Sequence, residues 1–81
     1  MDCPEEIKFE IPERAARHFA GRYPVNTIDG ARMTFPRGWG LIRSSNTQPV
    51  LVLRFEATDP EALDAYRSET MSWLAAQGVT A

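Results

Sequence analysis

The richest binding chemistry in this sequence lies in seven consecutive residues, Arg43-Ser44-Ser45-Asn46-Thr47-Gln48-Pro49. They supply one guanidinium, three hydroxyls and two amides, and there is no acid among them. A guanidinium presents a planar fork of N–H donors that matches two oxygens of a phosphate, and a turn adds side-chain and backbone donors. This composition fits an anion-binding loop in which Arg43, Ser45, Asn46 and Thr47 are the donors.

A plain turn is the competing interpretation of the same residues. Ser, Asn and Thr are frequent in any turn between two strands, and Arg43 could simply pair with an acid. On residue chemistry alone this interpretation is favoured.

The composition describes one ordinary domain of 81 residues, 43% of them hydrophobic and 25% charged. A net charge of -2 argues against a module that neutralises many nucleic-acid phosphates. Cys3 is the only cysteine, which excludes a disulfide framework and a cysteine-rich metal site. No apolar run reaches the ~18 residues of a membrane span, and the first residues do not resemble a signal peptide, so we expect a cytoplasmic protein without a membrane partner.

Two segments precede the hairpins. Residues Glu6–Ile11 alternate polar and apolar, which predicts a half-buried strand. Pro12 suits the first turn of a helix, and Gly21 suits its end. Between them, one apolar stripe predicts a short helix: Ala15, Ala16, Phe19 and Ala20.

Hairpins and a second helix make up the rest. Asp29-Gly30 is typical of a tight hairpin turn with positive φ, and Pro36-Arg37-Gly38 marks another reversal. Asp59-Pro60 predicts a helix start, and Gly78 its end. The predicted strands of this part are residues 31–35, 39–43 and 50–57, and the inward stripe of the helix is Leu63, Tyr66, Thr70, Trp73 and Leu74. The predicted order β-α-β-β-β-α indicates an α+β domain, an antiparallel sheet with two helices on one face.

The hairpins and the loop together resemble one family. Asp29-Gly30-Ala31-Arg32, followed by Gly38-Trp39-Gly40-Leu41-Ile42-Arg43-Ser44-Ser45-Asn46-Thr47-Gln48-Pro49, is similar to the C-terminal domain of the α-D-phosphohexomutases, the phosphomannomutase/phosphoglucomutase family. The family pattern is a D-G-x-[KR] hairpin, then G-W-x-L-x-R-x-S-N-T-x-P, then a strand and a helix. The resemblance extends from Pro4 to about Gln77.

The resemblance implies a TATA-binding-protein-like fold, a four-stranded antiparallel sheet with two helices on one face. It also implies that Arg43, Ser45, Asn46 and Thr47 bind the non-reacting phosphate of a hexose 1- or 6-phosphate, while Ser44 occupies a variable position. In the intact enzyme this domain would close the active-site cleft during reversible intramolecular phosphoryl transfer. Residues 1–81 would then be one C-terminal domain of a larger four-domain mutase.

The family's phosphoserine loop and magnesium loop have no counterpart in this sequence. The resemblance places both in other domains, so we expect no cofactor and no catalytic residue here, and no activity from the chain alone. The expected partners are the hexose phosphate and the other domains of the enzyme, and nucleic acid is not expected.

A non-enzymatic binding module is the alternative, because similar folds bind nucleic acid or protein on the open face of the sheet. A basic face that bears aromatic residues would favour it, whereas the net negative charge opposes it. Trp39 and Trp73 are expected in the core. His18 is expected at the surface, and the acids Glu61, Asp64 and Glu69 on a solvated helix face.

Overall fold

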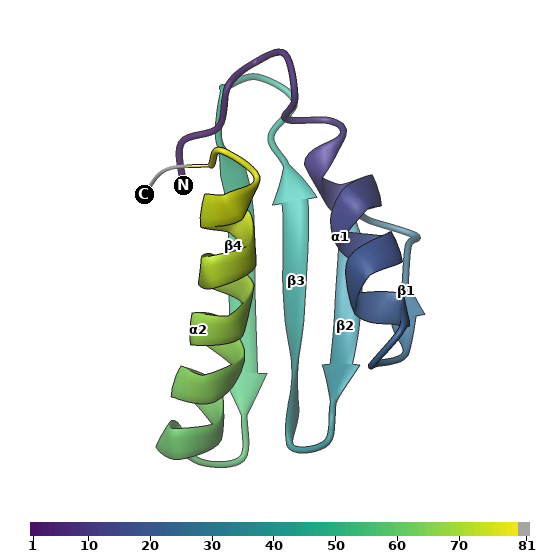
Figure 1. The fold of residues 1–81 in the computed structure, drawn as a ribbon, viewed down its shortest axis with the longest axis vertical. Helices are drawn as coiled ribbons and strands as arrows, with labels where there is room; N and C mark the ends of the chain where they lie inside the picture. The colour runs from purple at the N-terminus through teal and green to yellow at the C-terminus, as the bar shows by residue number, and fades with distance from the viewer. Residues whose placement is uncertain (80–81) are drawn as a thin grey trace.

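A four-stranded antiparallel sheet carries two helices on one face in the computed structural model, which describes residues 1–79 (Figure 1). The strands lie in the order β1-β2-β3-β4, so each pairs with its neighbour in sequence. This arrangement confirms the predicted α+β class, the antiparallel sheet and the pair of helices. The elements are α1 (Ile11–Ala20), β1 (Val25–Asn26), β2 (Ala31–Phe35), β3 (Gly38–Ser44), β4 (Leu51–Ala57) and α2 (Pro60–Ala76).

The first predicted strand, Glu6–Ile11, is wrong. This part of the chain forms turns, in which the Ile7 N–H donates to the Pro4 carbonyl at 3.1 Å and the Glu10 N–H donates to the Ile7 carbonyl at 2.9 Å. These local bonds use the backbone groups that a strand would offer to a neighbour, and α1 begins directly afterwards. The order of elements is therefore α-β-β-β-β-α, with the short β1 as the fourth strand in place of the one predicted at the start.

The predicted alternation of this segment fails as well. Lys8, placed on the polar side of the strand, is only 1% exposed, whereas Phe9, placed on the apolar side, is 57% exposed. A tightly turning backbone does not alternate its side chains between two faces as a strand does. The burial of Lys8 affects the candidate site.

The turn between β1 and β2 is longer than the tight hairpin predicted at Asp29-Gly30. β1 ends at Asn26, whose side-chain oxygen accepts the Ile28 N–H at 2.9 Å, and this local bond opens a loop over residues 27–30. Gly30 has a φ of 83°, but Asp29 is not in the positive region, so the two-residue turn cannot form. A Cβ on Gly30 would lie 2.3 Å from the Ile42 carbonyl oxygen, which explains why glycine stands there.

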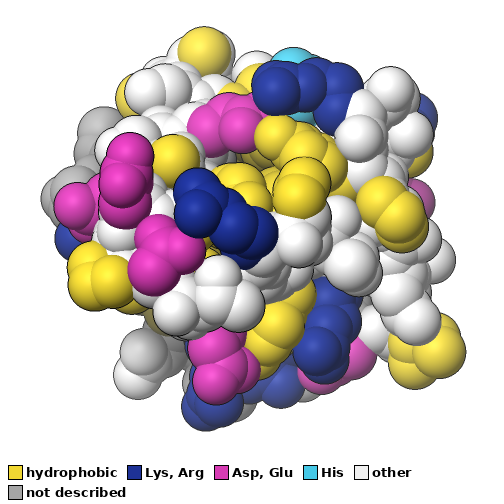
Figure 2. Space-filling model, turned by 90° about the horizontal axis from the view of Figure 1, so that it is seen from below, with side chains coloured by type: hydrophobic (Ala, Val, Ile, Leu, Met, Phe, Trp, Pro, Cys, Tyr) yellow, Lys and Arg dark blue, Asp and Glu magenta, His cyan; other side chains and the backbone are white. Residues whose placement is uncertain are grey.

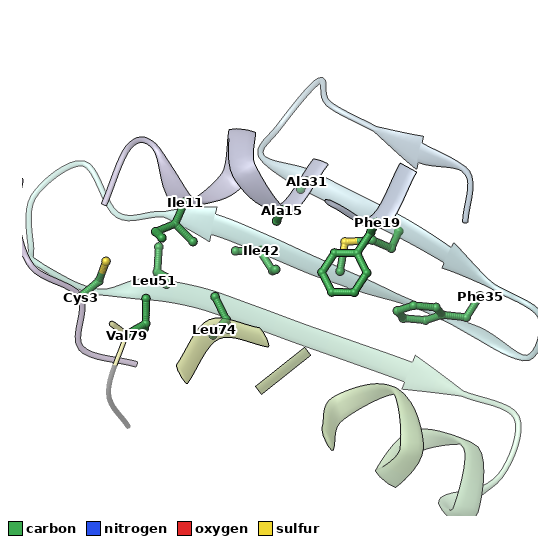
Figure 3. Close-up of a cluster of buried hydrophobic side chains, with 11 residues drawn as sticks. Cys3, Ile11, Ala15, Phe19, Ala31, Phe35, Ile42, Leu51, Leu74 and Val79 are labelled. Carbon is green, nitrogen blue, oxygen red and sulfur yellow. The ribbon is translucent and has the colours of Figure 1, made fainter. Parts of the chain in front are cut away.

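The core fills the space between the sheet and both helices (Figure 3). Phe35 lies at one end of the core. Its ring stacks on that of Tyr66, with 4.2 Å between the ring centres, and meets the Tyr23 ring edge-on at 4.7 Å. Burying a large apolar side chain contributes about 1.5–3 kcal/mol, so this cluster holds the helices to the sheet. Its members are Cys3, Ile11, Ala15, Phe19, Ala31, Met33, Phe35, Ile42, Leu51, Leu74 and Val79.

Trp39 is not in this core, contrary to the prediction. It lies on the open face of the sheet, where its Nε1 donates to Glu56 at 3.0 Å and the Arg32 guanidinium lies 4.3 Å from the ring centre. Trp73 does pack against the core and stacks on the exposed His18 at 5.2 Å. The period-two rule fixes which positions share a face of the sheet, but the type of side chain did not tell which face is covered.

The second helix starts as predicted. Asp59 accepts the Ala62 N–H at 2.8 Å as the N-cap, and the helix ends shortly before Gly78, whose φ is 88°. Glu61 and Asp64 are exposed as expected, but Glu69 is only partly exposed because it accepts hydrogen bonds from Tyr23 and Arg22 across to the end of α1. In the described part of the chain no helix is long and apolar enough to cross a membrane.

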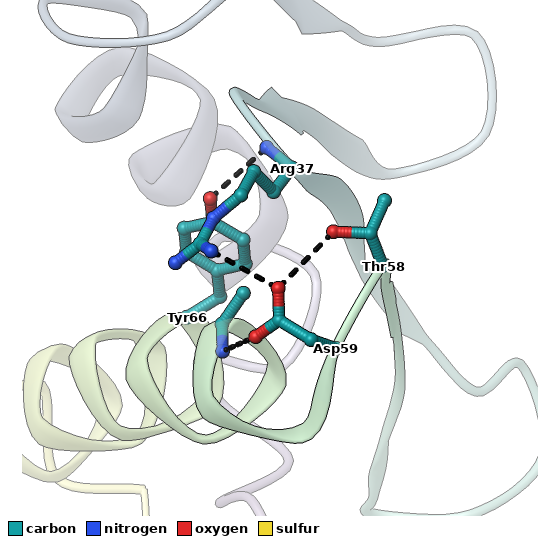
Figure 4. Close-up of polar contacts among 5 residues, drawn as sticks. Arg37, Thr58, Asp59 and Tyr66 are labelled. Atoms are coloured by element: carbon teal, nitrogen blue, oxygen red, sulfur yellow. Dashed lines mark hydrogen bonds and ion pairs between the residues drawn. The ribbon is translucent and has the colours of Figure 1, made fainter.

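Polar contacts close the end of the sheet at the β2–β3 turn (Figure 4). The Arg37 guanidinium donates to Asp59 at 3.0 Å, and the Arg37 N–H donates to the Tyr66 hydroxyl at 3.0 Å. The Thr58 hydroxyl also donates to Asp59, at 3.3 Å. Seen from this end, basic and acidic side chains lie close to one another over the surface (Figure 2).

Candidate phosphate-binding loop

The candidate loop lies at the other end of the sheet, where β3 ends and the chain crosses to β4 (Figure 1). The structure brings all four predicted residues to one surface hollow of about 910 Å³. Phe9, the exposed side of α1 and the β1–β2 loop complete its lining. The predicted residues in that lining are Arg43, Ser45, Asn46 and Thr47.

Arg43 stands on the open face of the sheet, opposite Val52 of β4. Its Nη1 lies 3.4 Å from the Asp29 carboxylate, and the side chains are 46% and 70% exposed. Arg43 thus does pair with an acid, as the interpretation of the loop as a plain turn expects, but only through this long contact. A long, solvated pair of this kind contributes about 0–1 kcal/mol, so the guanidinium can be redirected to a stronger anion at little cost.

Ser45 organises the loop through its own hydroxyl. Its Oγ accepts the Thr47 N–H at 3.3 Å and the Gln48 N–H at 3.2 Å, while its backbone N–H donates to the Val50 carbonyl at 3.1 Å. With two N–H groups directed at the oxygen, the hydroxyl proton is what remains for an outside acceptor. The Thr47 N–H is consumed inside the turn and is not free for an anion, unlike the turn amides expected from the sequence.

Asn46 and Thr47 form the exposed tip of the loop. Their amide and hydroxyl groups line the hollow. The Asn46 N–H has no acceptor among the described residues. The donors at this tip are therefore one side-chain amide, one hydroxyl and one backbone N–H.

The N-terminal segment supports the loop from outside, which sequence reasoning missed. The Cys3 N–H donates to the Pro49 carbonyl at 2.9 Å, and the Lys8 ammonium donates to the Gln48 carbonyl at 2.9 Å. Cys3 is buried in this contact, and burial raises the pKa of its thiol. Pro4 and the alternation of the following residues suggested a strand, so nothing local pointed to these contacts.

Charges around the hollow are mixed. Arg17 of α1 lines it beside Arg43, and the acids Glu13 and Asp29 line it too. Arg54 lies on the same open face as Arg43, two positions beyond the residue paired with it. Basic and acidic side chains thus lie together around the hollow, in a chain whose net charge is -2. Residues 1–79 contain no group of three or more His, Cys, Asp or Glu side chains that could hold a metal ion.

The sequence of residues 3–72 matches the family described as phosphoglucomutase/phosphomannomutase, C-terminal domain. A phosphomannomutase/phosphoglucomutase of Pseudomonas aeruginosa is 48% identical over 65 residues, which is 79% of this chain and 14% of that protein. A phosphoglucomutase of Neisseria meningitidis is 50% identical over 60 residues, which is 73% of this chain and 13% of that protein. The chain thus spans only a small part of the curated relatives it matches.

The fold is matched as well. A solved structure of a phosphoglucomutase/phosphomannomutase family protein from Burkholderia thailandensis superposes with a TM-score of 0.69 at 47% sequence identity. The match covers 86% of this chain and 15% of that one.

Proposed function

Because this chain belongs to the phosphoglucomutase/phosphomannomutase family, as the C-terminal domain, we propose that its β3–β4 loop binds the non-reacting phosphate of a hexose phosphate. The observation that carries the proposal is the internal bonding of the loop. The Ser45 oxygen accepts the inner N–H groups of the turn, while Arg43, Ser45, Asn46 and Thr47 line one hollow.

These donors suit a phosphate in number and in kind. The Arg43 fork engages two oxygens, and the loop supplies hydroxyl and amide donors for the third. Each charge-assisted hydrogen bond contributes about 1.5–3 kcal/mol, but the entropy lost on association offsets much of the sum. For this chain alone we expect a Kd of about millimolar or weaker.

In a larger, four-domain mutase the same contact would orient the substrate. Binding energy from the phosphate that does not react positions the one that does, and movement of this domain would close the cleft around the sugar. The phosphoserine and magnesium of the reaction would come from other domains, so this chain by itself catalyses no phosphoryl transfer. A cytoplasmic location fits a hexose phosphate substrate.

The open sheet face supports a second candidate, a binding module for single-stranded nucleic acid. This face carries Trp39 together with Arg32 and Arg54, and stacking on an aromatic ring beside basic residues is how such modules bind bases. One face of the Trp39 ring is already covered by Arg32, however, and its Nε1 is engaged by Glu56. The phosphate site is therefore the favoured function.

Amide NMR of the ¹⁵N-labelled chain distinguishes the phosphate-binding function from the nucleic-acid-binding one. Titration with glucose 6-phosphate should move the resonances of Ser45, Asn46 and Thr47 first and leave those near Trp73 still. Glucose alone should move none of them, and added salt should weaken the response. If the loop ignores the sugar phosphate and a single-stranded oligonucleotide instead shifts Thr34, Trp39 and Leu41, the nucleic-acid function replaces the proposed one.

A further inference from the structure

Lys8 is the most deeply buried charged side chain in the described part of the molecule. Its side chain is 2% exposed, yet its Nζ has three neighbours around it. It donates to the Gln48 carbonyl at 2.9 Å, pairs with the Glu5 carboxylate at 3.2 Å and lies 4.9 Å from the centre of the Phe9 ring. The ammonium is thus surrounded by a carbonyl, a carboxylate and an aromatic ring, each of which favours a cation.

The burial of this cation costs free energy that its partners only partly return. An apolar side chain of the same length in such a place is often as stable or more stable than a buried ion pair. Glu5 itself is 63% exposed, so the pair gains little from a low dielectric on that side. Stability of the fold is thus a weak reason for a lysine here, and its contact with the loop is a better one.

The contact of Lys8 with the loop connects it, through the single residue Gln48, to Ser45, one of the residues predicted to bind phosphate. Gln48 accepts from Lys8 at its backbone carbonyl and donates from its backbone N–H to the Ser45 Oγ at 3.2 Å. The carbonyl belongs to the peptide unit that Gln48 forms with Pro49, and the N–H to the unit that it forms with Thr47. The two contacts therefore meet at Gln48, and Lys8 acts by holding this residue in place. The Ser45 oxygen is held by the Gln48 N–H and by that of Thr47, so the direction of its proton depends on where Gln48 sits.

We propose that Lys8 is a positioning residue for the phosphate loop: it fixes the position of Gln48 so that the Ser45 hydroxyl proton points to the anion. This rests on the proposed function of the loop. Lys8 touches no ligand itself and acts through Gln48 and Ser45. Because the Gln48 carbonyl also accepts the Val50 N–H at 2.8 Å, it keeps a partner when the lysine is replaced, and the substitution tests positioning rather than an orphaned carbonyl.

The test is Lys8→Met in the 81-residue chain, titrated with inorganic phosphate and with glucose 6-phosphate by ¹⁵N NMR. Arg14→Met is the matched control, because it removes the same charge from an exposed pair with Glu10 that does not line the hollow. Lys8→Met should weaken phosphate binding about two- to tenfold, the effect of one hydrogen bond. Hydrogen exchange of the Gln48 and Thr47 amides should quicken, while the midpoint of thermal unfolding is unchanged or higher.

Wild-type affinity in Lys8→Met, or an equal loss in Arg14→Met, would overturn the role of Lys8 and leave the phosphate site standing. A loss of affinity accompanied by a matching fall in the unfolding midpoint would also overturn it, since the residue would then be structural. No binding by the unmutated chain would overturn the site and this role together. Should Lys8→Met fail to fold, Lys8→Gln, which is smaller and polar, carries the same expectations.

Discussion

The two ends of the sheet each carry an exposed arginine, and the fold treats them differently. At the β2–β3 turn, the Arg37 guanidinium meets Asp59 at 3.0 Å, and the Arg37 backbone is bonded to Tyr66 and Thr58 (Figure 4). At the β3–β4 loop, the only contact of the Arg43 guanidinium with an acid among residues 1–79 is the long one of 3.4 Å to Asp29. The first arginine is tied into a network that joins the sheet to α2, whereas the second keeps its donors available.

The comparison shows how polar residues of one type divide between folding and binding. Polar groups that form hydrogen bonds or ion pairs within the chain hold helices and strands together, and their loss is expected to lower the stability of the fold. Groups that are preorganised but face solvent add little to stability and are available to a ligand.

Gly30→Ala should have the largest effect, at the loop end. The residue has a φ of 83°, and the new Cβ would lie 2.3 Å from the Ile42 oxygen and 3.1 Å from the Arg43 Cα. The conformation alone costs about 1–3 kcal/mol, and the collision with backbone adds to it. For a domain of this size each kcal/mol lowers the unfolding midpoint by about 4–8 °C, which a thermal melt followed by circular dichroism measures.

Gly78→Ala is the matched control for that substitution. Its φ is 88°, but an added Cβ would meet no atom within 4 Å. Only the conformational cost applies, about 1–3 kcal/mol as at Gly30. An equal fall in the unfolding midpoint for the two variants would show that the close backbone approach beneath Arg43 is not what requires glycine at position 30.

The turn end should respond to acid through Asp59. The hydrogen bond from the Ala62 N–H, with a smaller contribution from Arg37, holds the pKa of Asp59 below its ordinary value. A carboxyl whose folded pKa is lowered stabilises the fold above its unfolded pKa, near 3.9, and this stabilisation is lost as pH falls through the folded pKa. Asp59→Asn keeps a capping side chain without a charge.

Between about pH 5 and pH 2 the unfolding midpoint of the unmutated chain should therefore fall more steeply than that of Asp59→Asn. Near pH 7 the variant should be slightly less stable, because the cap is kept and the exposed pair with Arg37 is lost. Thermal melts across this range measure both effects. Parallel acid profiles of the two proteins would mean that Asp59 does not stabilise the turn end through its charge.

Features that depend on residues close together in the sequence were predicted correctly. The contiguous loop from Arg43 to Thr47, the Asp59 cap and the alternation of β4 were all found from neighbouring residues, because the chemistry and geometry of each reside within a few positions. The strand at residues 6–11 was wrong because bonds between near neighbours curl that segment. Trp39 was misplaced because a large aromatic side chain was taken as a sign of burial, whereas it pairs with Thr34 and Glu56 on the open face.

Long-range contacts could not be predicted in the same way. Lys8 and Gln48 are 40 positions apart, and a lysine in an alternating segment is indistinguishable from one on a solvated face until the backbone is known. The contact of Arg43 with Asp29 depends on the length of the β1–β2 loop, which the Asp29-Gly30 pair misrepresented. The loop residues were predictable, but the contacts that hold and orient them were not.

The most direct test of the account compares Arg43→Ala with Arg37→Ala, which remove the same charge from opposite ends of the sheet. Phosphate and glucose 6-phosphate are titrated into each ¹⁵N-labelled variant, and the unfolding midpoint is measured alongside. Arg43→Ala should weaken binding about ten- to a hundredfold with little change in stability, because a charge-assisted contact is lost. Arg37→Ala should keep the affinity and lower the midpoint. Equal losses of affinity in the two variants, or none in Arg43→Ala, would contradict a phosphate site at the loop.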